Sequence, residues 1–457
     1  MASFLDREHT VAGPGFNRWL VPPAALAIHL CIGQGYALSV FNLPMSRLLG
    51  ITHSAPGDWP LTTTVWMFNI AFATLGAAAF TWGRWLERVG PRRAMFVAAL
   101  CFGSGLGIEG AAVAMHFLPL LYLGAVVYGI GLGLGYISPV STLIKWFPDR
   151  PGMATGMAIM GFGGGAMIGS PLAQNLMDFY KSPSSVGVAQ TLVTMGAIYL
   201  AFMMFGVVTV RVPPPGYRPV GWVPREAGSQ ALVTSASVTA QQALKTPQFW
   251  LLWAVLCLNV TAGIGVLSQA SPMIQETFAG RVNAAAAAGF VGFISIFNLL
   301  GRFLWSSVSD FLGRKRTYAV YFALGTVLYC AVPTLGRTGN VALFVATFCL
   351  IFTMYGGGFA TIPAYLRDLF GVREVGAIHG RLMTAWSVAA VVGPSLVTYL
   401  RQYQLDRGAP KAEVYGETMY IMAGLLVAGL LCNAAVSAVH ERHHAAVEMD
   451  DARPAGA

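Results

Sequence analysis

One arginine interrupts a long apolar run. Arg302 lies in the segment FVGFISIFNLLGRFLWSSVSDFLGRKR at residues 290–316, eight residues before Asp310. Eight helical residues span roughly 12 Å, which is a long way for a side chain to extend towards water. An arginine inside an apolar span costs at least about 2.5–3.5 kcal/mol and usually marks a substrate or ion path. We therefore favour a binding role for Arg302 over simple extension to the membrane surface.

The chemistry of this side chain indicates its ligand. A guanidinium presents a rigid fork of donors that pairs with both oxygens of a carboxylate. Asn298 lies four residues earlier, so both side chains share one face of the expected helix. The two residues together predict a site for a small organic anion.

Trp386 is a second candidate for this site. It lies about twelve residues into its own apolar run, roughly mid-membrane, whereas tryptophan usually gathers near the membrane surfaces. A buried indole N–H needs a hydrogen-bond partner. We expect Trp386 to line a cavity, with ordinary packing as the alternative.

The composition is that of a membrane protein. Of 457 residues, 56% are hydrophobic and 10% are charged, and the mean hydropathy is +0.62. The net charge of +9 comes from basic residues in short loops, so we expect no nucleic acid partner. The six cysteines fall within apolar runs without metal-ligand spacing, and no nucleophile–base pair is apparent. We therefore predict no metal, no cofactor and no catalytic residue, and the chain is not expected to be an enzyme.

The sequence predicts an all-α polytopic membrane protein with twelve transmembrane helices in two six-helix bundles. Each apolar run supplies at least the ~20 residues that a membrane crossing needs. The predicted spans are 18–43, 61–83, 94–114, 118–141, 151–174, 190–211, 247–272, 284–309, 317–336, 340–367, 375–400 and 416–438. The corresponding regions are a leader at 1–17, a first bundle at 18–211, a linker at 212–246, a second bundle at 247–438 and a tail at 439–457.

The distribution of basic residues predicts the orientation. Twenty of the 28 Lys and Arg residues fall on the side of the two termini, seven fall on the other side, and the last is Arg302. The positive-inside rule then places both termini in the cytoplasm.

The two predicted bundles repeat each other. GRWLERVGPRR at 83–93 follows the second span, and SSVSDFLGRKR at 306–316 follows the eighth. Their acidic residues, glycines and basic pairs stand 223 positions apart: Glu87 and Asp310, Gly90 and Gly313, and Arg92–Arg93 and Lys315–Arg316. Such a repeat around a central linker is typical of a transporter whose site lies between the halves.

These segments resemble the major facilitator superfamily, whose loop signature G-x-x-x-(D/E)-x-x-G-x-(R/K)-(R/K) fits in full from Gly83, while the second copy has Ser306 in place of its first glycine. More narrowly, YGIGLGLGYISPVSTLIKWFPDRPGMATG at 128–156 and GGGFATIPAYLRDLFG at 356–371 resemble the oxalate/formate antiporter family. The resemblance implies a secondary transporter with twelve spans.

The resemblance also implies roles for individual residues. It assigns carboxylate binding to Arg302, and it places the aromatics of spans 1 and 4 around the central cavity: Tyr36, Tyr128 and Tyr136. Gln34 is expected on a different face of its span from Tyr36. Tyr355 occupies the matching repeat position in span 10.

Two departures from the related families narrow the chemistry. Related proton-coupled monocarboxylate transporters have an aspartate where this chain has Asn298, which favours exchange or uniport over proton symport. The oxalate antiporter has a lysine in a T-A-K segment where this chain has Trp386. A single cation favours a monocarboxylate over a dianion.

A further group of residues is expected to act as gates. A carboxylate facing a helix N-terminus and a basic residue can hold the cytoplasmic side closed. The candidates are Glu87, Arg88, Arg92, Asp310, Arg314 and His379, with a role in topology alone as the alternative for the basic ones. The four-residue spacing of Gly161, Gly165 and Gly169 permits close helix contact. The resemblance implies that this stretch lies at the contact between the halves, so that a bulky residue at Gly165 would impair movement more than binding.

The sequence therefore predicts a transporter that moves a small organic anion, with a monocarboxylate favoured, across a bacterial inner membrane by alternating access. Its predicted partners are that anion and the lipid bilayer, and the chain is predicted to be monomeric. One alternative is a transporter of another small solute in which Arg302 is structural. A second alternative is a membrane sensor without transport.

Overall fold

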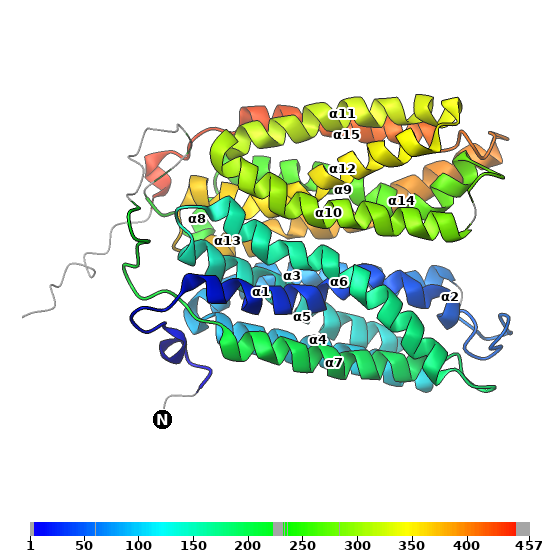
Figure 1. Ribbon diagram of the computed structural model, residues 1–457, viewed down its shortest axis with the longest axis horizontal. Coiled ribbons are helices and arrows are strands. Elements are labelled where there is room, and N and C mark those ends of the chain that lie inside the picture. The colour runs from blue at the N-terminus through cyan, green and yellow to red at the C-terminus, as the bar shows by residue number, and fades with distance from the viewer. Residues whose placement is uncertain are drawn as a thin grey trace, which may run out of the picture.

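The computed structural model describes residues 4–59, 61–222, 232, 234, 236–282 and 284–444 (Figure 1). Much of the predicted linker, at 223–231, and most of the predicted tail, at 445–457, lie outside these residues. The first bundle begins with a span built from several short pieces, Arg18–Leu20, α1 (Val21–Ile32), the 3-10 segment Gly33–Phe41 and α2 (Asn42–Met45). Five long helices follow: α3 (Leu61–Val89), α4 (Pro91–Ala114), α5 (Leu118–Trp146), α6 (Pro151–Tyr180) and α7 (Val188–Thr209).

The second bundle follows the short helix α8 (Ala240–Ala243). It contains α9 (Pro247–Thr277), α10 (Ala284–Leu312), α11 (Arg314–Thr338), α12 (Val341–Phe370), α13 (Val375–Leu382), α14 (Thr384–Asp406) and α15 (Gly416–Ala435). Helices α13 and α14 together match one predicted span, which is divided at Met383.

The helices agree with the predicted spans to within a few residues at most ends. Ten segments among the described residues are long and apolar enough to cross a membrane. Helices α3 and α10 match the two remaining predicted spans and carry charged residues near their ends. The prediction of a twelve-span helical membrane protein is confirmed.

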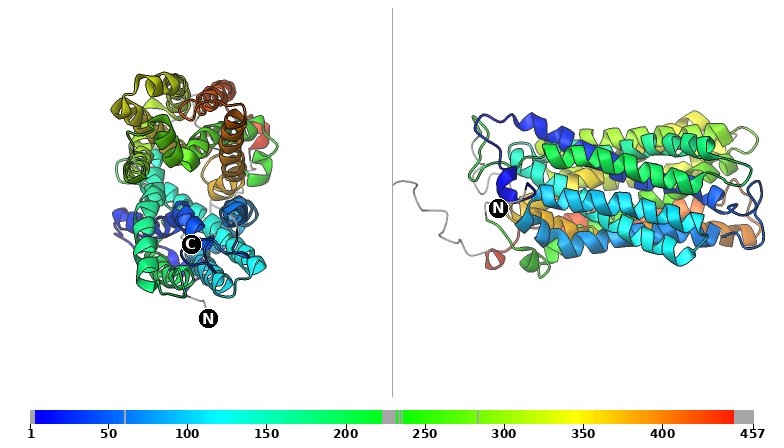
Figure 2. Two further views of the ribbon diagram at one scale, coloured as in Figure 1. Left: turned by 90° about the vertical axis from the view of Figure 1, so that its right-hand side faces the viewer. Right: turned by 90° about the horizontal axis from the view of Figure 1, so that it is seen from below.

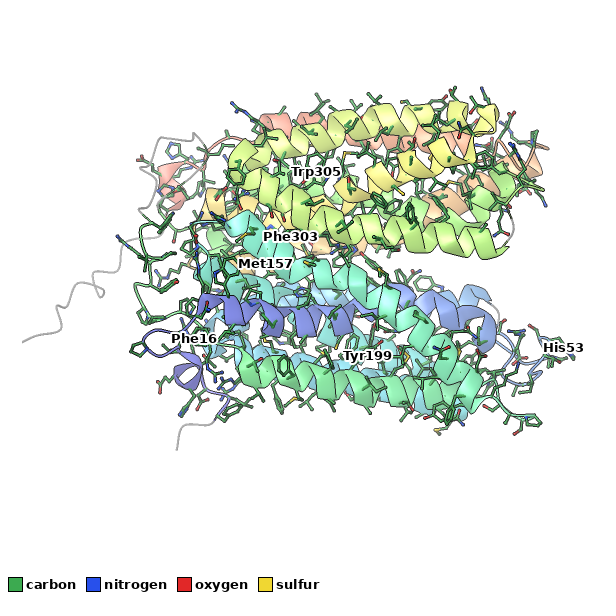
Figure 3. All side chains as sticks on the ribbon, viewed as in Figure 1. Phe16, His53, Met157, Tyr199, Phe303 and Trp305 are labelled. Atoms are coloured by element: carbon green, nitrogen blue, oxygen red, sulfur yellow. The ribbon has the colours of Figure 1, made fainter. Side chains whose placement is uncertain are left out.

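The two bundles lie side by side, as the end-on view in Figure 2 shows. The leader, the described residues between α7 and α8, and residues 436–444 lie at one end of the molecule, which we call the termini face (left in Figure 1). The opposite end, which includes His53, is the loop face (Figure 3). The main contacts between the bundles join α6 to α10 and α12, and α3 to α13 and α14.

Matching glycines form matching turns in the two bundles. Gly90 precedes α4 with φ of 87°, and Gly313 precedes α11 with φ of 86°. This region of backbone conformation is readily accessible only to glycine. The repeat seen in the sequence therefore has the same local geometry in both bundles.

The bundles approach each other closely at glycines. A Cβ atom on Gly152 or Gly156 of α6 would lie 2.1 Å from the carbonyl or hydroxyl oxygen of Ser306 on α10, and one on Gly163 would lie 3.2 Å from the Cβ of Leu299. Met157 and Phe303 lie at the same boundary (Figure 3). Small residues permit this close helix contact.

The expectation for the other glycine face of α6 is wrong. A Cβ on Gly165 would meet the carbonyl oxygen of Leu30 at 2.2 Å, and Gly161 and Gly169 also contact residues of the first bundle. This face packs on the first span, whose backbone comes close at Gly33. A bulky residue at Gly165 should therefore disturb the first bundle itself, whereas Gly152, Gly156 and Gly163 serve the contact between the bundles.

Replacing Gly83 by valine is expected to slow transport at least about tenfold without abolishing folding. A Cβ at Gly83 would lie 2.8 Å from the Cα of Ala377, across the contact between α3 and α13. Overpacking of this kind costs roughly 1–3 kcal/mol. Here it destabilises only the conformation in which α3 and α13 are in contact. Transport rates in vesicles would be compared with those of Gly107→Val, since a Cβ at Gly107 meets nothing within 4 Å. Equal rates for both variants would contradict the prediction.

Candidate functional site

Arg302 lies fully buried on α10, between the bundles. Its Nε donates to Asn298 Oδ1, one turn earlier on the same helix, at 3.2 Å, and its Nη1 is 3.4 Å from the carbonyl oxygen of Ile159 on α6. Its Nη2 has no hydrogen-bond partner within the described part of the chain. Among the described residues, no carboxylate forms an ion pair with this guanidinium.

Six aromatic side chains form what we call the aromatic cage, with Trp386 of α14 at its centre. The other five rings have centroids 4.6–6.1 Å from that of Trp386: Tyr36, Phe72, Tyr136, Phe162 and Phe359. The Arg302 guanidinium lies 5.5 Å from the ring centroid of Phe162 and 5.1 Å from that of Phe359. Both bundles therefore contribute to one cluster beside the cation.

The tyrosines named from the sequence occupy two places. The hydroxyls of Tyr36 and Tyr355 are 3.4 Å apart, so these residues join the two bundles beside the cage. Tyr128 instead donates to Gln34 Oε1 at 2.8 Å inside the first bundle, where its ring packs on Phe102. Gln34 and Tyr36 thus point to different faces, as expected.

Several buried polar atoms around the cage lack hydrogen-bond partners among the residues that the structure describes. These are Arg302 Nη2, Trp386 Nε1, the Tyr136 hydroxyl, His29 Nε2 and both ring nitrogens of His379. The His29 and His379 rings contact that of Tyr136, with centroids 5.3 and 5.8 Å away. The Tyr136 hydroxyl lies close to the Arg302 guanidinium.

Unpartnered groups of this kind are costly. Each buried donor without an acceptor costs roughly 1–3 kcal/mol, and more when it is charged. Most of the atoms concerned can donate, and one group is a permanent cation. A small anion that accepts several hydrogen bonds would satisfy the donors and neutralise the charge.

Three members of the cage were not identified from the sequence: Phe72, Phe162 and Phe359. Each is a phenylalanine in an apolar span, and such a residue is equally typical of lipid contact or of packing. The sequence therefore offers no distinctive signal for them. Only their convergence on Trp386 in the folded chain distinguishes them.

Glu87 forms one contact between the bundles at the termini face. Its Oε1 accepts from Ser141 Oγ at 2.9 Å and from the amide of Gly376, at the N-terminus of α13, at 3.1 Å. Its Oε2 accepts from Lys145 Nζ at 2.6 Å. A carboxylate from the first bundle thus meets a helix N-terminus of the second.

Asp310 forms the corresponding contact in the opposite direction. Its two oxygens accept from the amides of Gly152 and Met153, at the N-terminus of α6, at 2.8 and 2.9 Å. Arg314 Nη2 donates to the same carboxylate at 2.6 Å, and its Nε reaches Asp368 Oδ2 at 3.1 Å. The sequence repeat therefore corresponds to a pair of reciprocal contacts.

The remaining gate candidates lie elsewhere. Arg88 is exposed, and Lys145 rather than Arg88 neutralises Glu87. Arg92 is buried and donates to the carbonyl oxygens of Phe4, His9 and Val210, so it holds the leader against α4. His379 lies beside Tyr136 of the cage, one turn along α13 from Gly376.

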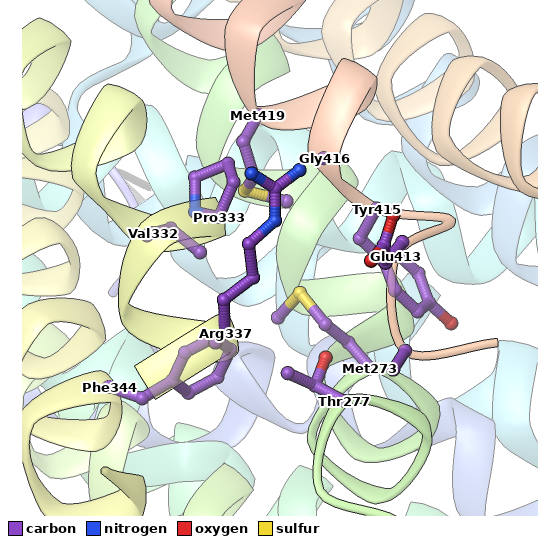
Figure 4. Close-up of a pocket in the computed structure, with 12 residues that line it drawn as sticks. Met273, Thr277, Val332, Pro333, Arg337, Phe344, Glu413, Tyr415, Gly416 and Met419 are labelled. Atoms are coloured by element: carbon purple, nitrogen blue, oxygen red, sulfur yellow. The ribbon is translucent and has the colours of Figure 1, made fainter. Parts of the chain in front are cut away.

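The described residues contain no group of three or more His, Cys, Asp or Glu side chains placed to hold a metal ion. A pocket at the loop face of the second bundle lies at the ends of α9 and α11 and the start of α15, with Arg337 extending beside Met273 and Met419 (Figure 4). Arg302 is not among the residues that line it. This pocket is therefore separate from the candidate site.

Comparison with known proteins places this geometry in a family. The Major Facilitator Superfamily profile matches residues 25–394 and 265–450. The Oxalate:formate antiporter of Oxalobacter formigenes is 26% identical over 386 residues, covering 83% of this chain and 84% of that protein. The Apicoplast pyruvate carrier 1 of Toxoplasma gondii is 25% identical over 406 residues, covering 76% and 70%.

The fold is also similar to that of solved transporters. The transporter FucP in its outward conformation has a TM-score of 0.62 and 14% identity, covering 91% of this chain and 99% of that chain. The profile match spans most of the sequence and both bundles. This chain belongs to the major facilitator superfamily of membrane transporters.

Proposed function

We propose that this transporter moves a small monocarboxylate by exchange or facilitated transport, with Arg302 as the carboxylate-binding residue. The observation that carries this proposal is the fully buried guanidinium with an unpartnered Nη2 and no described carboxylate paired to it. A cation in this environment gains most from an anion that both neutralises it and accepts its hydrogen bonds. The named relatives act on oxalate and formate, and on pyruvate, which supports the same class of solute.

The cage supplies the selectivity in this proposal. With one cation and six aromatic rings among its described residues, the site suits a single carboxylate with a short tail rather than a dianion. Tyr36 and Tyr355 come from different bundles and meet at their hydroxyls. An anion held between them and Arg302 would contact both bundles, as alternating access about a central site requires.

The Glu87 and Asp310 contacts act as latches in this cycle. Both join the bundles at the termini face and hold this conformation closed on that side. The excess of Lys and Arg at this face favours its placement in the cytoplasm of a bacterial inner membrane. Access from the cytoplasm then requires both latches to open.

Counterflow in vesicles tests the proposal directly. The purified chain would be reconstituted, loaded with one unlabelled carboxylate, and supplied outside with labelled formate, pyruvate, lactate or oxalate. We expect saturable uptake of at least one monocarboxylate that depends on the internal anion or on its gradient. Absence of saturable uptake of every anion would refute the proposal, and uptake of a neutral solute instead would favour a structural role for Arg302.

Trp386→Phe is expected to weaken binding of the transported anion about 10- to 100-fold. Phenylalanine keeps a ring at the centre of the cage but removes the Nε1–H donor, which has no partner among the described residues. One lost hydrogen bond to a charged group corresponds to roughly 1.5–3 kcal/mol, and each 1.4 kcal/mol changes a binding constant about tenfold. Substrate-dependent thermal stabilisation of the purified variant would measure the affinity, with Trp250→Phe, at an exposed tryptophan, as the control. Unchanged affinity would assign Trp386 to packing alone.

A further inference from the structure

The two copies of the repeated basic pair have different surroundings. In the first bundle, the leader covers the pair: Arg92 donates to backbone carbonyls of the leader, its guanidinium lies 4.3 Å from the ring centroid of Phe4, and Arg93 pairs with Asp6. Both cations of the first copy therefore have partners within the chain.

The second copy lies in a cavity of about 700 Å³ at the termini face. Lys315 Nζ donates to the carbonyl oxygens of Ala434 and Val436, both at 2.7 Å, at the end of α15. Arg316 is exposed and has no hydrogen bond or ion pair with any described residue. Arg316 occupies the position that matches Arg93 of the Arg93–Asp6 pair, but it has no anionic partner among the described residues.

The walls of this cavity are partly apolar and face outwards. Phe311 is 84% exposed, and Leu312, Ala319 and Leu430 continue the apolar lining beside it. Helices α11 and α15 form the outer edge of the second bundle (Figure 1). Apolar surface at the ends of membrane helices, next to an exposed cation, matches the two parts of a phospholipid molecule.

Charge favours an anionic lipid over a neutral one. The lining includes Arg314, Lys315 and Arg316 but, among the described residues, only one carboxylate, Asp368, and that carboxylate is paired with Arg314. Any ligand here therefore meets an excess of positive charge, and Arg316 is the cation that has no partner among the described residues.

We propose that this cavity binds the headgroup of an anionic phospholipid. Its phosphate pairs with Arg316, and its acyl chains lie along Phe311, Leu312 and Leu430. Because Arg314 lines the cavity and also pairs with Asp310, the bound lipid stabilises the Asp310 contact and with it the conformation closed at the termini face.

Native mass spectrometry of the purified full-length chain tests this proposal. Phosphatidylglycerol and phosphatidylcholine with identical acyl chains would be titrated separately, and retained lipid counted. We expect phosphatidylglycerol to bind about tenfold or more tightly, and Arg316→Gln to remove that preference, since hydrogen bonds to a charged group are among the strong ones. Arg218→Gln is the matched control, because Arg218, in the linker, is also exposed and its replacement removes the same charge.

The outcomes separate the occupants that could fill the cavity. Equal affinity for the two lipids, or an unchanged preference in Arg316→Gln, would overturn the proposal. The tail carries Glu448, Asp450 and Asp451. If phosphatidylglycerol binds only after these are replaced by their amides, the acidic tail and not a lipid fills the cavity, and the proposal again fails.

A second measurement follows the thermal stability that the protein gains when the lipid binds. Phosphatidylglycerol is expected to raise the melting temperature of the wild type and of Arg218→Gln, but not that of Arg316→Gln. A similar rise in all three proteins would contradict a specific site. This test does not depend on the transported solute, so it remains informative whatever anion the protein carries.

Discussion

Replacing Arg302 by lysine is expected to lower the affinity for the transported anion about 100-fold while the protein still folds. Lysine keeps the positive charge but loses the planar fork that can bind both carboxylate oxygens. Each hydrogen bond to a charged group contributes roughly 1.5–3 kcal/mol, and each 1.4 kcal/mol changes a binding constant about tenfold. The lost bond to Asn298, whose Oδ1 is 3.2 Å from Nε, adds to the effect because it holds the guanidinium in place.

Concentration dependence of counterflow and thermal stabilisation by the anion would measure this loss. Arg337→Lys is the matched control, since Arg337 is exposed at the loop face and does not approach the cage. Wild-type affinity in Arg302→Lys would show that the guanidinium does not bind the carboxylate. A folded variant that binds the anion weakly but exchanges it at high concentration would agree with the proposal.

The centre of the site was predictable to the extent that its residues are unusual where they occur. Arg302 in an apolar run and Trp386 at mid-membrane depth carry a signal that a single sequence reveals, because either residue is costly or rare there. Phe162 and Phe359 carry no such signal. Their spacing is compatible with packing or lipid contact, and only the fold brings both rings to within 5.5 Å of the same guanidinium.

At the termini face too, the sequence indicated some of the contacts and not others. The repeat identified Glu87 and Asp310 as a matching pair, and the structure places both at helix N-termini of the opposite bundle. The repeat did not identify Gly376 as the partner of Glu87, from which it is 289 residues away in the chain. Arg92 was expected at a gate but holds the leader instead. The sequence did not indicate this contact, because Phe4 and His9 lie in a segment without any recognisable pattern.

The double variant Glu87→Gln and Asp310→Asn is expected to open the termini face and to slow exchange at least about tenfold. Each amide keeps the size of the side chain but removes the negative charge that accepts from a helix N-terminus and a basic residue. Losing about 1.5–3 kcal/mol at each contact would shift the equilibrium between closed and open forms by more than about 100-fold in total. A transporter held open on one side binds its anion but cannot complete the cycle.

Labelling of a cysteine placed at Ala360 would report this shift. Ala360 is buried on α12, and its carbonyl oxygen accepts from Thr155 of α6, across the contact between the bundles. In a background without the six native cysteines, the double variant should label at least about tenfold faster from the termini face than the parent. Glu413→Gln, which removes an exposed charge at the loop face, should leave labelling unchanged.

Anion affinity in the double variant should stay within a few-fold of the parent, because neither carboxylate touches the cage. Affinity and labelling together therefore separate a change in the latches from damage to the site. Slow labelling in the double variant would mean that other contacts, such as that of Gly83 with Ala377, keep this face closed on their own.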